Sequence, residues 1–191
     1  DNVEIRIDNP DENGIGEVIT KGDNIMHGYY DNEEATAAVL RDGWFHTGDL
    51  GYIDKSGYLF LSGRKKNVIV LKNGKNVFPE ELEAEISALP YQMENIVVGL
   101  PKNGDDRDLV VALKIVYDPE QFAGMSKEEI EKRIHEDVDK INDRMPLYKH
   151  IKRIFITDEP MIKTSTSKVR RFLEIEKMLE EENKDGGTDG K

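Results

Sequence analysis

The stretch GRKKNVIVLKNGKNVFPEELEAE, residues Gly63 to Glu85, decides how this chain is organised. Its first part, up to Phe78, contains five basic residues and no acidic one, in a chain whose formal net charge is −12 at pH 7. The basic residues are Arg64, Lys65, Lys66, Lys72 and Lys75. A basic segment in an acidic protein concentrates positive potential where an anion can be held. The stretch therefore predicts contact with a small phosphorylated ligand.

The same stretch predicts a β-hairpin followed by a helix. An apolar, β-branched run over 68–71 and the pair Val77-Phe78 flank the turn signal Lys-Asn-Gly-Lys. Pro79 has the fixed φ that suits a first helical position, and the acidic residues after it favour the positive end of the helix dipole. We expect this helix to end at Leu89, because Pro90 follows.

The residues after the basic turn predict a small α+β domain. Strands are expected over 95–99, 109–116 and 151–157, and a second helix over 126–145, where Ser126 and Glu129 form a capping box. Because that helix lies between the second and third strands, we expect the helices to pack on one face of a three-stranded sheet. A last helix is expected from about Val169. The polar, Gly-rich tail 181–191 is expected to be disordered.

The first third of the chain is β-rich. Strands are predicted over 3–7 and 16–20, and Asn32 is a suitable cap for a short helix. These short strands and tight turns look incomplete as a domain. The start of the sequence reads as the middle of a longer protein, with neither the basic nor the apolar region of a signal peptide. We therefore expect residues 1–63 to be the last piece of a large domain and residues 64–180 to be a complete small domain.

Composition excludes several classes of protein. The 191 residues are 37% hydrophobic and 35% charged, and no apolar run approaches membrane-spanning length. The absence of cysteine removes disulfides, thiolate metal sites and cysteine nucleophiles. The acidic balance argues against nucleic acid as a partner, because backbone binding needs a basic face. We expect a cytoplasmic protein without a transmembrane segment.

The sequence from Gly63 to Glu85 resembles a motif of the adenylate-forming enzymes, G-R-x-K-(D/N)-x-I-x-x-x-G-x-x-(V/I)-x-P-x-E-(L/I)-E. This superfamily contains acyl-CoA synthetases, luciferases and peptide-synthetase adenylation domains. The stretch is most similar to the long-chain fatty-acid CoA ligases. The resemblance implies that a large N-terminal AMP-binding domain ends near residue 63 and that a small C-terminal domain swings about the basic turn.

Two residues are candidates for holding the sugar of a nucleotide. Asp49 lies in Trp-Phe-His-Thr-Gly-Asp-Leu, and its carboxylate can accept both hydroxyls of a ribose, although a turn aspartate can also cap its own backbone. Arg64 offers a planar guanidinium for ribose or phosphate oxygens, although a solvated surface arginine is the plain alternative. The resemblance to the superfamily's T-G-D and G-R-x-K elements implies that both residues contact ATP.

Lys168 is the candidate catalytic residue. The segment Lys163-Thr-Ser-Thr-Ser-Lys168 resembles the superfamily element P-x-T-x-x-G-K, which implies that this lysine enters the active site during adenylation. An ammonium there offsets the repulsion between a carboxylate and the α-phosphate of ATP. Ile162 and Ser167 depart from the usual Pro and Gly, which questions the loop conformation. A basic helix start at the surface is the alternative.

The resemblance also assigns a hinge and a CoA contact. Lys66 falls on the hinge position, and Gly74 falls where the backbone approaches the pantetheine arm of CoA, although an exposed lysine and a plain turn glycine explain both. Val70 stands where many members carry a lysine for thioester formation. Lys72 would replace it only on a regular strand. The histidines, 27, 46, 135 and 150, show no metal-ligand spacing, so no metal site is expected in this chain.

Together these resemblances imply the C-terminal fragment of an ATP-dependent acyl-CoA synthetase. The whole enzyme would activate a carboxylic acid, by preference a fatty acid, as acyl-AMP and transfer it to CoA, with Mg²⁺ held with the ATP by ligands upstream. The fragment's partner would be the missing N-terminal domain, and the fragment alone is expected to be inactive. Another adenylate-forming enzyme, activating an aryl or amino acid, is the nearest alternative. A non-catalytic module that binds nucleotide or docks a partner is the alternative from another class.

Overall fold

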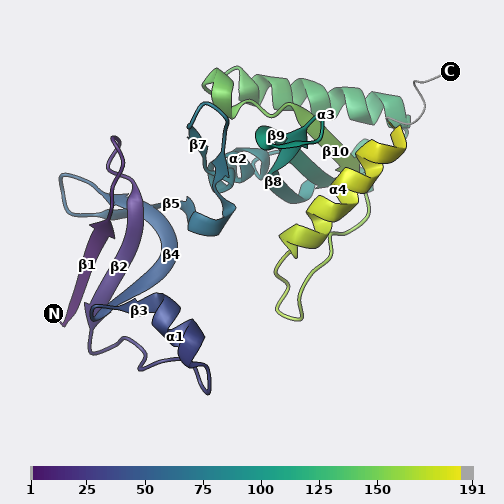
Figure 1. Cartoon of the computed structure of the whole chain (residues 1–191). Helices are drawn as coiled ribbons and strands as arrows, with labels where there is room; N and C mark the ends of the chain where they lie inside the picture. Colours follow the sequence, from purple (N-terminus) through teal and green to yellow (C-terminus); the bar gives the residue numbers. More distant parts are fainter. Residues whose placement is uncertain (1, 186–191) are drawn as a thin grey trace. The chain divides into compact units, whose positions relative to one another are not determined.

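The computed structural model describes residues 2–185, and the chain divides after Val68 into two compact units (Figure 1). The sequence places the boundary earlier, after residue 63. The difference arises at the basic turn, where Arg64 ends a strand of the first unit and Lys65 is bonded to Glu17 of that unit. The basic turn therefore belongs to the first unit.

The first unit is an antiparallel sheet with one short helix. Strand β4 is its centre, because β2, β3 and β5 all pair with it, and β1 pairs with β2. The strands are β1 (Val3–Asp8), β2 (Gly16–Gly22), β3 (Leu40–Arg41), β4 (Trp44–Ile53) and β5 (Leu59–Arg64). Helix α1 (Glu33–Val39) is capped by Asn32, whose side chain accepts a hydrogen bond from the Ala35 N–H as predicted.

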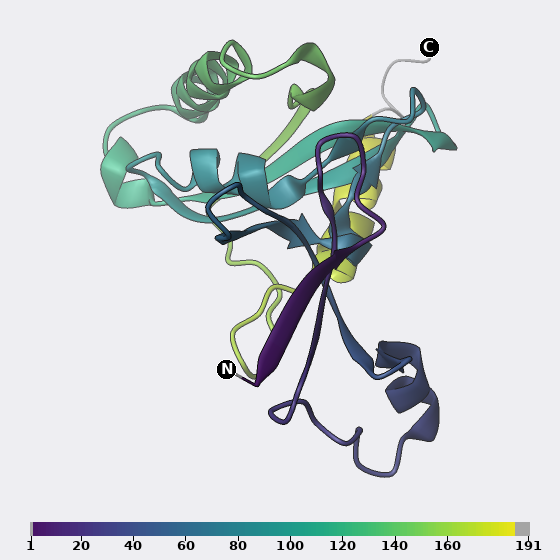
Figure 2. The ribbon, with the colours of Figure 1, turned by 90° about the vertical axis from the view of Figure 1, so that its left-hand side faces the viewer.

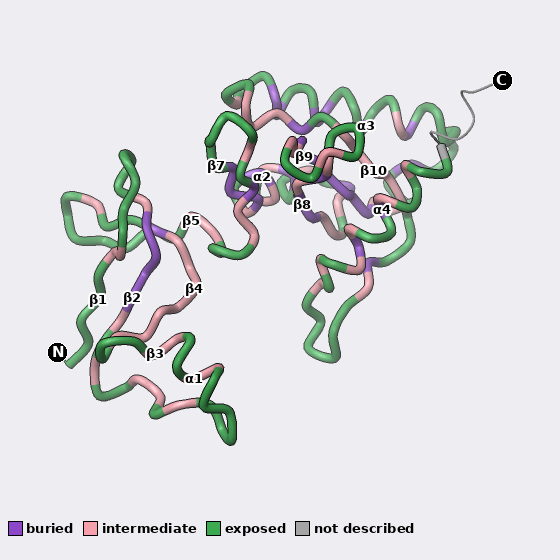
Figure 3. The backbone as a smooth tube through the Cα atoms, in the orientation of Figure 1, coloured by how far each residue is buried: buried purple, intermediate pink, exposed green. Residues whose placement is uncertain are grey.

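The first unit buries little apolar surface (Figure 3). Among residues 2–68, the buried apolar side chains are Val18 and Ile19. Its exposed large apolar side chains are Val3, Ile5, Tyr29, Tyr30, Tyr52, Ile53, Tyr58, Leu59, Phe60 and Leu61. Because hydrophobic stabilisation scales with the apolar area removed from water, this sheet gains little of it from its own residues.

The second unit contains the three-stranded sheet, with β9 in its centre. Strand β8 (Gln92–Lys102) is antiparallel to β9 (Asp105–Tyr117), and β10 (Arg153–Thr157) is parallel to it. The hairpin ahead of the sheet pairs β6 (Ile69–Val70) with β7 (Asn76–Val77) and leads into α2 (Pro79–Ile86), which begins at the proline as predicted. The α+β class is confirmed.

Helix α3 (Lys127–Asn142) makes the crossover between the two parallel strands. Its predicted capping box is present: the Ser126 side chain accepts from the Glu129 N–H, and the Glu129 side chain accepts from the Ser126 N–H. Within residues 2–185, short 3-10 helices complete the connections: η1 (Lys65–Asn67), η2 (Pro119–Phe122) and η3 (Leu147–Lys149). The last helix, α4, spans Arg171–Asp185.

The helices cover both faces of the sheet, and the expectation of a single covered face is wrong (Figure 2). Val111, Leu113 and Ile115 of β9 pack in one core with α2 and α3. Ala112 and Val116, on the opposite face, pack with Met178 of α4. The physical reason lies in β9, whose residues are apolar on both sides and therefore need a cover on both.

Helix α4 extends into the segment that the sequence predicts to be a disordered tail. Residues 181–185, expected to be disordered, are helical, and Glu182 forms an ion pair with Arg153 of β10 at 2.8 Å. The remaining tail, 186–191, lies outside the described residues. Within residues 2–185, no helix is both long enough and apolar enough to cross a membrane.

The tight core of the second unit predicts that shortening one of its buried side chains lowers the free energy of unfolding strongly. Ile134 of α3 is fully buried, so Ile134→Ala should lower the free energy of unfolding by about 2–5 kcal/mol. Leu147, which is 80% exposed, provides the control, and Leu147→Ala should change it by less than about 0.5 kcal/mol. Urea denaturation followed by circular dichroism at the helix band measures both. Similar losses for the two variants would contradict the assignment of this core.

Candidate functional site

Asp49 and Arg64 face each other across two neighbouring strands. They are direct cross-strand partners of β4 and β5, and Arg64 Nε lies 2.8 Å from Asp49 Oδ1. The side chains are 29% and 53% exposed, so the pair is accessible to a ligand rather than sealed in a core. The structure thus brings together the two residues that the sequence assigned separately to the nucleotide.

Strand β4 has a bulge just before Asp49, where its pairing with β2 shifts register between Glu17 and Ile19. Thr47 Oγ1 donates a hydrogen bond to the Val18 carbonyl at 2.7 Å and accepts one from the Asp49 N–H at 3.0 Å. Gly48 has a φ of +72°, a conformation that side chains disfavour, and no atom lies within 4 Å of where its Cβ would be. The Thr-Gly-Asp sequence therefore forms a fixed bulge within β4, with open space beside its glycine.

Glu17 organises this bulge, and sequence reasoning missed the residue. The side chain is 7% exposed, and its Oε1 accepts a hydrogen bond from the Gly48 N–H at 3.1 Å. Its Oε2 lies 3.2 Å from His46 Nδ1 and 3.0 Å from Lys65 Nζ. Burial by itself raises the pKa of Glu17, but the bonds from Lys65, His46 and Gly48 outweigh it and hold the pKa below its ordinary value. One glutamate in a strand carries no motif that could have revealed this role.

Glu17 also belongs to a group that could be mistaken for a metal centre. Single ligand atoms of Asp8, Glu17 and His46 all lie within 4.8 Å of one another, a grouping that the spacing of the histidines did not reveal. Glu17 already accepts from three donors, one of them the Lys65 ammonium, and that positive charge opposes binding of a cation here. We assign no metal to this group.

Lys66 lies in η1 beside Lys65 and is exposed. A hinge is a change of backbone dihedral angles between two conformations, and the structure describes one conformation. The hinge role of Lys66 therefore stays a prediction.

Gly74 lies at an open turn in the second unit. The turn is closed by hydrogen bonds from the Leu71 N–H to the Lys75 carbonyl, 2.9 Å, and from the Gly74 N–H to the Leu71 carbonyl, 2.8 Å. Gly74 has a φ of +77°, and no atom lies within 4 Å of where its Cβ would be. A ligand could approach the backbone closely at this glycine.

Lys72 lies in this same turn rather than on a strand. Strand β6 ends at Val70, so strand alternation does not relate the two residues. Lys72 Nζ lies 3.6 Å from Asp108 Oδ2. Both residues line a cavity of about 200 Å³, together with Tyr148, His150 and Lys152. The cavity thus contains two lysines and one carboxylate, and the Asp108 carboxylate already compensates the charge of Lys72.

Lys168 is carried by a loop that we name the strap, residues 161–170. Lys163 and Val169 form a bridge between the two legs of the strap. The Thr164 N–H donates to the Lys168 carbonyl at 2.8 Å, and the Lys168 N–H donates to Thr164 Oγ1 at 3.2 Å. The Lys168 side chain is exposed, and within residues 2–185 its ammonium forms no ion pair. The loop therefore fixes the backbone of Lys168 and leaves its charge available.

The two departures from the superfamily pattern have structural explanations. Ser167, in the place of the usual glycine, has a φ of +60°, the left-handed conformation that glycine adopts most easily. Ile162, in the place of the usual proline, donates its N–H to Glu174 Oε1 at 2.6 Å. A proline has no N–H, so this hydrogen bond is available only because of the departure.

The candidate residues are divided between the two units. Asp49, Arg64 and Lys66 belong to the first unit, and Gly74 and Lys168 belong to the second.

The role of Glu17 predicts a pH-dependent stability. Glu17→Gln keeps the size of the side chain but removes its charge, and it should lower the free energy of unfolding at pH 7 by about 1–3 kcal/mol. Because the folded state lowers the pKa of Glu17 from 4.5, its stabilisation is present above that value and is lost as the pH falls through the lowered pKa. The difference between the two proteins should therefore narrow below pH 4.5. Thermal unfolding followed by Trp44 fluorescence measures it, and a difference that is constant with pH would contradict this role.

Known proteins with similar sequences include several CoA ligases. The chain is 44% identical over 109 residues to the long-chain-fatty-acid–CoA ligase FadD15 of Mycobacterium tuberculosis, which covers 57% of this chain and 17% of that protein. It is 33% identical over 170 residues to an oxalate–CoA ligase of Arabidopsis thaliana, which covers 88% of this chain and 30% of the relative. The chain thus spans less than a third of the length of either relative.

A solved structure with the same fold is O-succinylbenzoate coenzyme A synthetase (MenE) from Bacillus subtilis, in complex with ATP and a magnesium ion. Its TM-score is 0.69 at 28% identity, and the match covers 90% of this chain and 33% of that one. The resemblance to adenylate-forming enzymes, and to long-chain fatty-acid CoA ligases in particular, is confirmed. Since residues 66–182, more than half of the chain, match the family model described as AMP-binding enzyme C-terminal domain, the chain belongs to this family.

Proposed function

We propose that this chain is the C-terminal portion of an AMP-forming acyl-CoA ligase whose acid substrate is a fatty acid. In the first half-reaction, a carboxylate oxygen attacks the α-phosphorus of ATP, which forms acyl-AMP and releases pyrophosphate. In the second, the thiol of CoA attacks the acyl carbon, which forms the thioester and releases AMP. The first unit would complete the large AMP-binding domain, and the second unit would form the small mobile domain.

The observation that carries this proposal is the exposed ammonium of Lys168 on a hydrogen-bonded loop. The attacking carboxylate and the phosphate are both anions, so a fixed positive charge near both lowers the barrier to their reaction. An ammonium already bound in an ion pair would have to give up that partner first. Lys168 has none among residues 2–185, which suits it to the adenylation step.

The pair of Asp49 and Arg64 supports the binding of ATP. The Asp49 carboxylate can accept hydrogen bonds from the two ribose hydroxyls, and its pairing with Arg64 orients it and leaves it partly exposed. The bound ATP of the B. subtilis synthetase supports the same class of ligand. Magnesium would enter with ATP, and we expect its protein ligands in the upstream part of the protein.

The turn at Gly74 supports the binding of CoA. The open backbone at this glycine suits the narrow pantetheine arm, and Lys152, which lines the cavity beside the turn, offers positive charge to an anionic ligand. Lys66 would be the hinge that exchanges the Lys168 loop for this turn between the half-reactions.

The fatty-acid substrate is favoured by the name of the 44% identical relative. The oxalate and succinylbenzoate ligases share the same fold region, so this region does not choose the acid. We therefore assign the choice to the upstream part of the protein.

The role of Lys168 predicts unequal effects on the two half-reactions. In the full-length enzyme, Lys168→Ala should slow adenylation by about 10²–10³-fold, because it removes one preorganised charge from the transition state. Thioester formation from a supplied acyl adenylate should change little. Pyrophosphate release and acyl-CoA formation measure the two steps separately.

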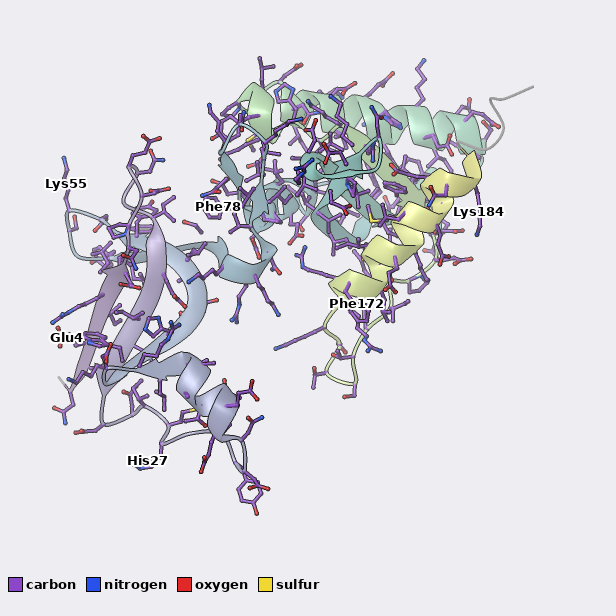
Figure 4. All side chains as sticks on the ribbon, viewed as in Figure 1. Glu4, His27, Lys55, Phe78, Phe172 and Lys184 are labelled. Atoms are coloured by element: carbon purple, nitrogen blue, oxygen red, sulfur yellow. The ribbon has the colours of Figure 1, made fainter. Side chains whose placement is uncertain are left out.

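Lys184→Ala is the matched control, because Lys184 is an exposed lysine of α4 away from the strap (Figure 4). Equal losses in both half-reactions would exclude the assigned role of Lys168. Binding of ATP without any turnover by the full-length protein would favour the non-catalytic nucleotide-binding module instead.

Because the proposal places part of the active site in the upstream part of the protein, it predicts that this chain is inactive by itself. The purified 191-residue chain, incubated with ATP, magnesium, CoA and a long-chain fatty acid, should form no acyl-CoA detectable by mass spectrometry. The physical reason is that the acid pocket and the phosphate-binding groups are assigned to the upstream part. Any acyl-CoA product above that of a Lys168→Ala control would contradict this division.

A further inference from the structure

The strap that carries Lys168 is attached to the rest of its unit by two carboxylates. One is Glu174 of α4, and the other is Glu94 of β8. Figure 4 shows the helix from which Glu174 comes, with Phe172 labelled near its start and Lys184 near its end. Neither glutamate belongs to a motif of the sequence, and neither contacts the candidate nucleotide or CoA residues.

Glu174 holds the first leg of the strap from a fully buried position. Its Oε1 accepts the Ile162 N–H at 2.6 Å, and its Oε2 lies 2.8 Å from Lys114 Nζ of β9. Burial by itself raises the pKa of Glu174, but the Ile162 N–H and the Lys114 ammonium outweigh it and lower the pKa. The carboxylate therefore stays charged at neutral pH. The second leg follows the first, because the Arg170 N–H donates to the Ile162 carbonyl at 2.8 Å.

Glu94 holds the same leg at two neighbouring points. Its Oε2 accepts the Met161 N–H at 3.2 Å, and its Oε1 lies 2.6 Å from Lys163 Nζ. Its side chain is mostly buried. Three successive residues of the strap, from Met161 to Lys163, are thus bonded to carboxylates. A charged acceptor makes each of these hydrogen bonds stronger than one between neutral groups.

We propose that Glu94 and Glu174 are positioning residues for Lys168. They fix the base of the strap, so that the Lys168 ammonium on its second leg reaches the reacting carboxylate and phosphate in one defined place. This inference rests on the proposed role of Lys168 in adenylation. It also explains why Ile162 stands in place of the usual proline, because only a residue with an N–H can donate to Glu174.

A positioning role and a purely structural one predict different results in the full-length enzyme. Glu94→Ala should slow adenylation by about 10–100-fold, because a small displacement of the ammonium weakens its effect on the transition state. Thioester formation from supplied acyl adenylate should change less than about twofold, since Lys168 takes no part in it. Glu94→Gln keeps an acceptor for the Met161 N–H and should restore part of the adenylation rate.

The decisive measurement is the adenylation rate of the double variant that carries both Glu94→Ala and Lys168→Ala. If Glu94 acts through Lys168, then Glu94→Ala should slow adenylation no further in the Lys168→Ala background. Glu182→Ala is the matched control, because Glu182 also forms an ion pair in this unit, with Arg153, but makes no bond to the strap. It should leave both half-reactions unchanged.

Hydrogen exchange of the 191-residue chain tests the attachment without any activity. Glu94→Ala should speed exchange at the amides of Thr164 and Lys168, which are hydrogen-bonded within the strap, and leave β9 unchanged. Ile162→Pro should have the same effect on the strap, because it removes the donor to Glu174, whereas Glu174→Gln keeps an acceptor and should speed exchange in the strap less. If Glu174→Gln fails to fold because Lys114 loses its counter-charge, the two Glu94 variants and Ile162→Pro carry the test.

The outcomes separate this inference from the proposed function. If Lys168→Ala slows adenylation selectively but neither Glu94→Ala nor Ile162→Pro does, the positioning role is overturned and the role of Lys168 stands. Equal losses in both half-reactions, or additive losses in the double variant, also overturn positioning. If the exchange results are as expected but Lys168→Ala leaves adenylation unchanged, the strap is held as described and the proposed function fails.

Discussion

Burial of both faces of β9 is the constraint on which the second unit depends. A strand that is apolar on both sides must be covered on both, which puts α2 and α3 over one face and α4 over the other. Lys114 lies on the α4 face of this strand, and a buried ammonium is tolerated only beside an opposite charge. Glu174 supplies that charge and, through the Ile162 N–H, ties the strap to the core.

The first unit also contains a buried glutamate that is paired with a lysine. Glu17 is buried, bonded to Lys65, and holds the bulge of β4 that presents Asp49. In both units, then, a buried carboxylate with a lysine partner supports an exposed candidate residue nearby. Such pairs add little net stability, but removing one partner leaves an uncompensated charge, so the arrangement specifies one local geometry. Rigid support of this kind is what a group acting on a transition state needs.

Much of this organisation could be predicted from the sequence. Signals that act within a few residues were reliable: the Asn32 cap, the Ser126–Glu129 capping box and the helix start at Pro79 are all as expected. The Thr-Gly-Asp and Gly-Arg motifs pointed to Asp49 and Arg64, which the strand register brings together. Glu17, Glu94 and Glu174 could not be found in the same way, because each acts on residues distant in sequence.

The sequence by itself determined the family, the α+β class, most helix and strand positions and the short motifs that contain Asp49, Arg64, Gly74 and Lys168. The reason is that caps, turns and motifs are local, and local chemistry is readable along the chain. The tertiary structure alone decided that α4 covers the second face of the sheet, that the basic turn belongs to the first unit, and that buried carboxylates hold both candidate sites. These features depend on which distant side chains share a buried space, and a buried charge finds its partner only when the chain has folded.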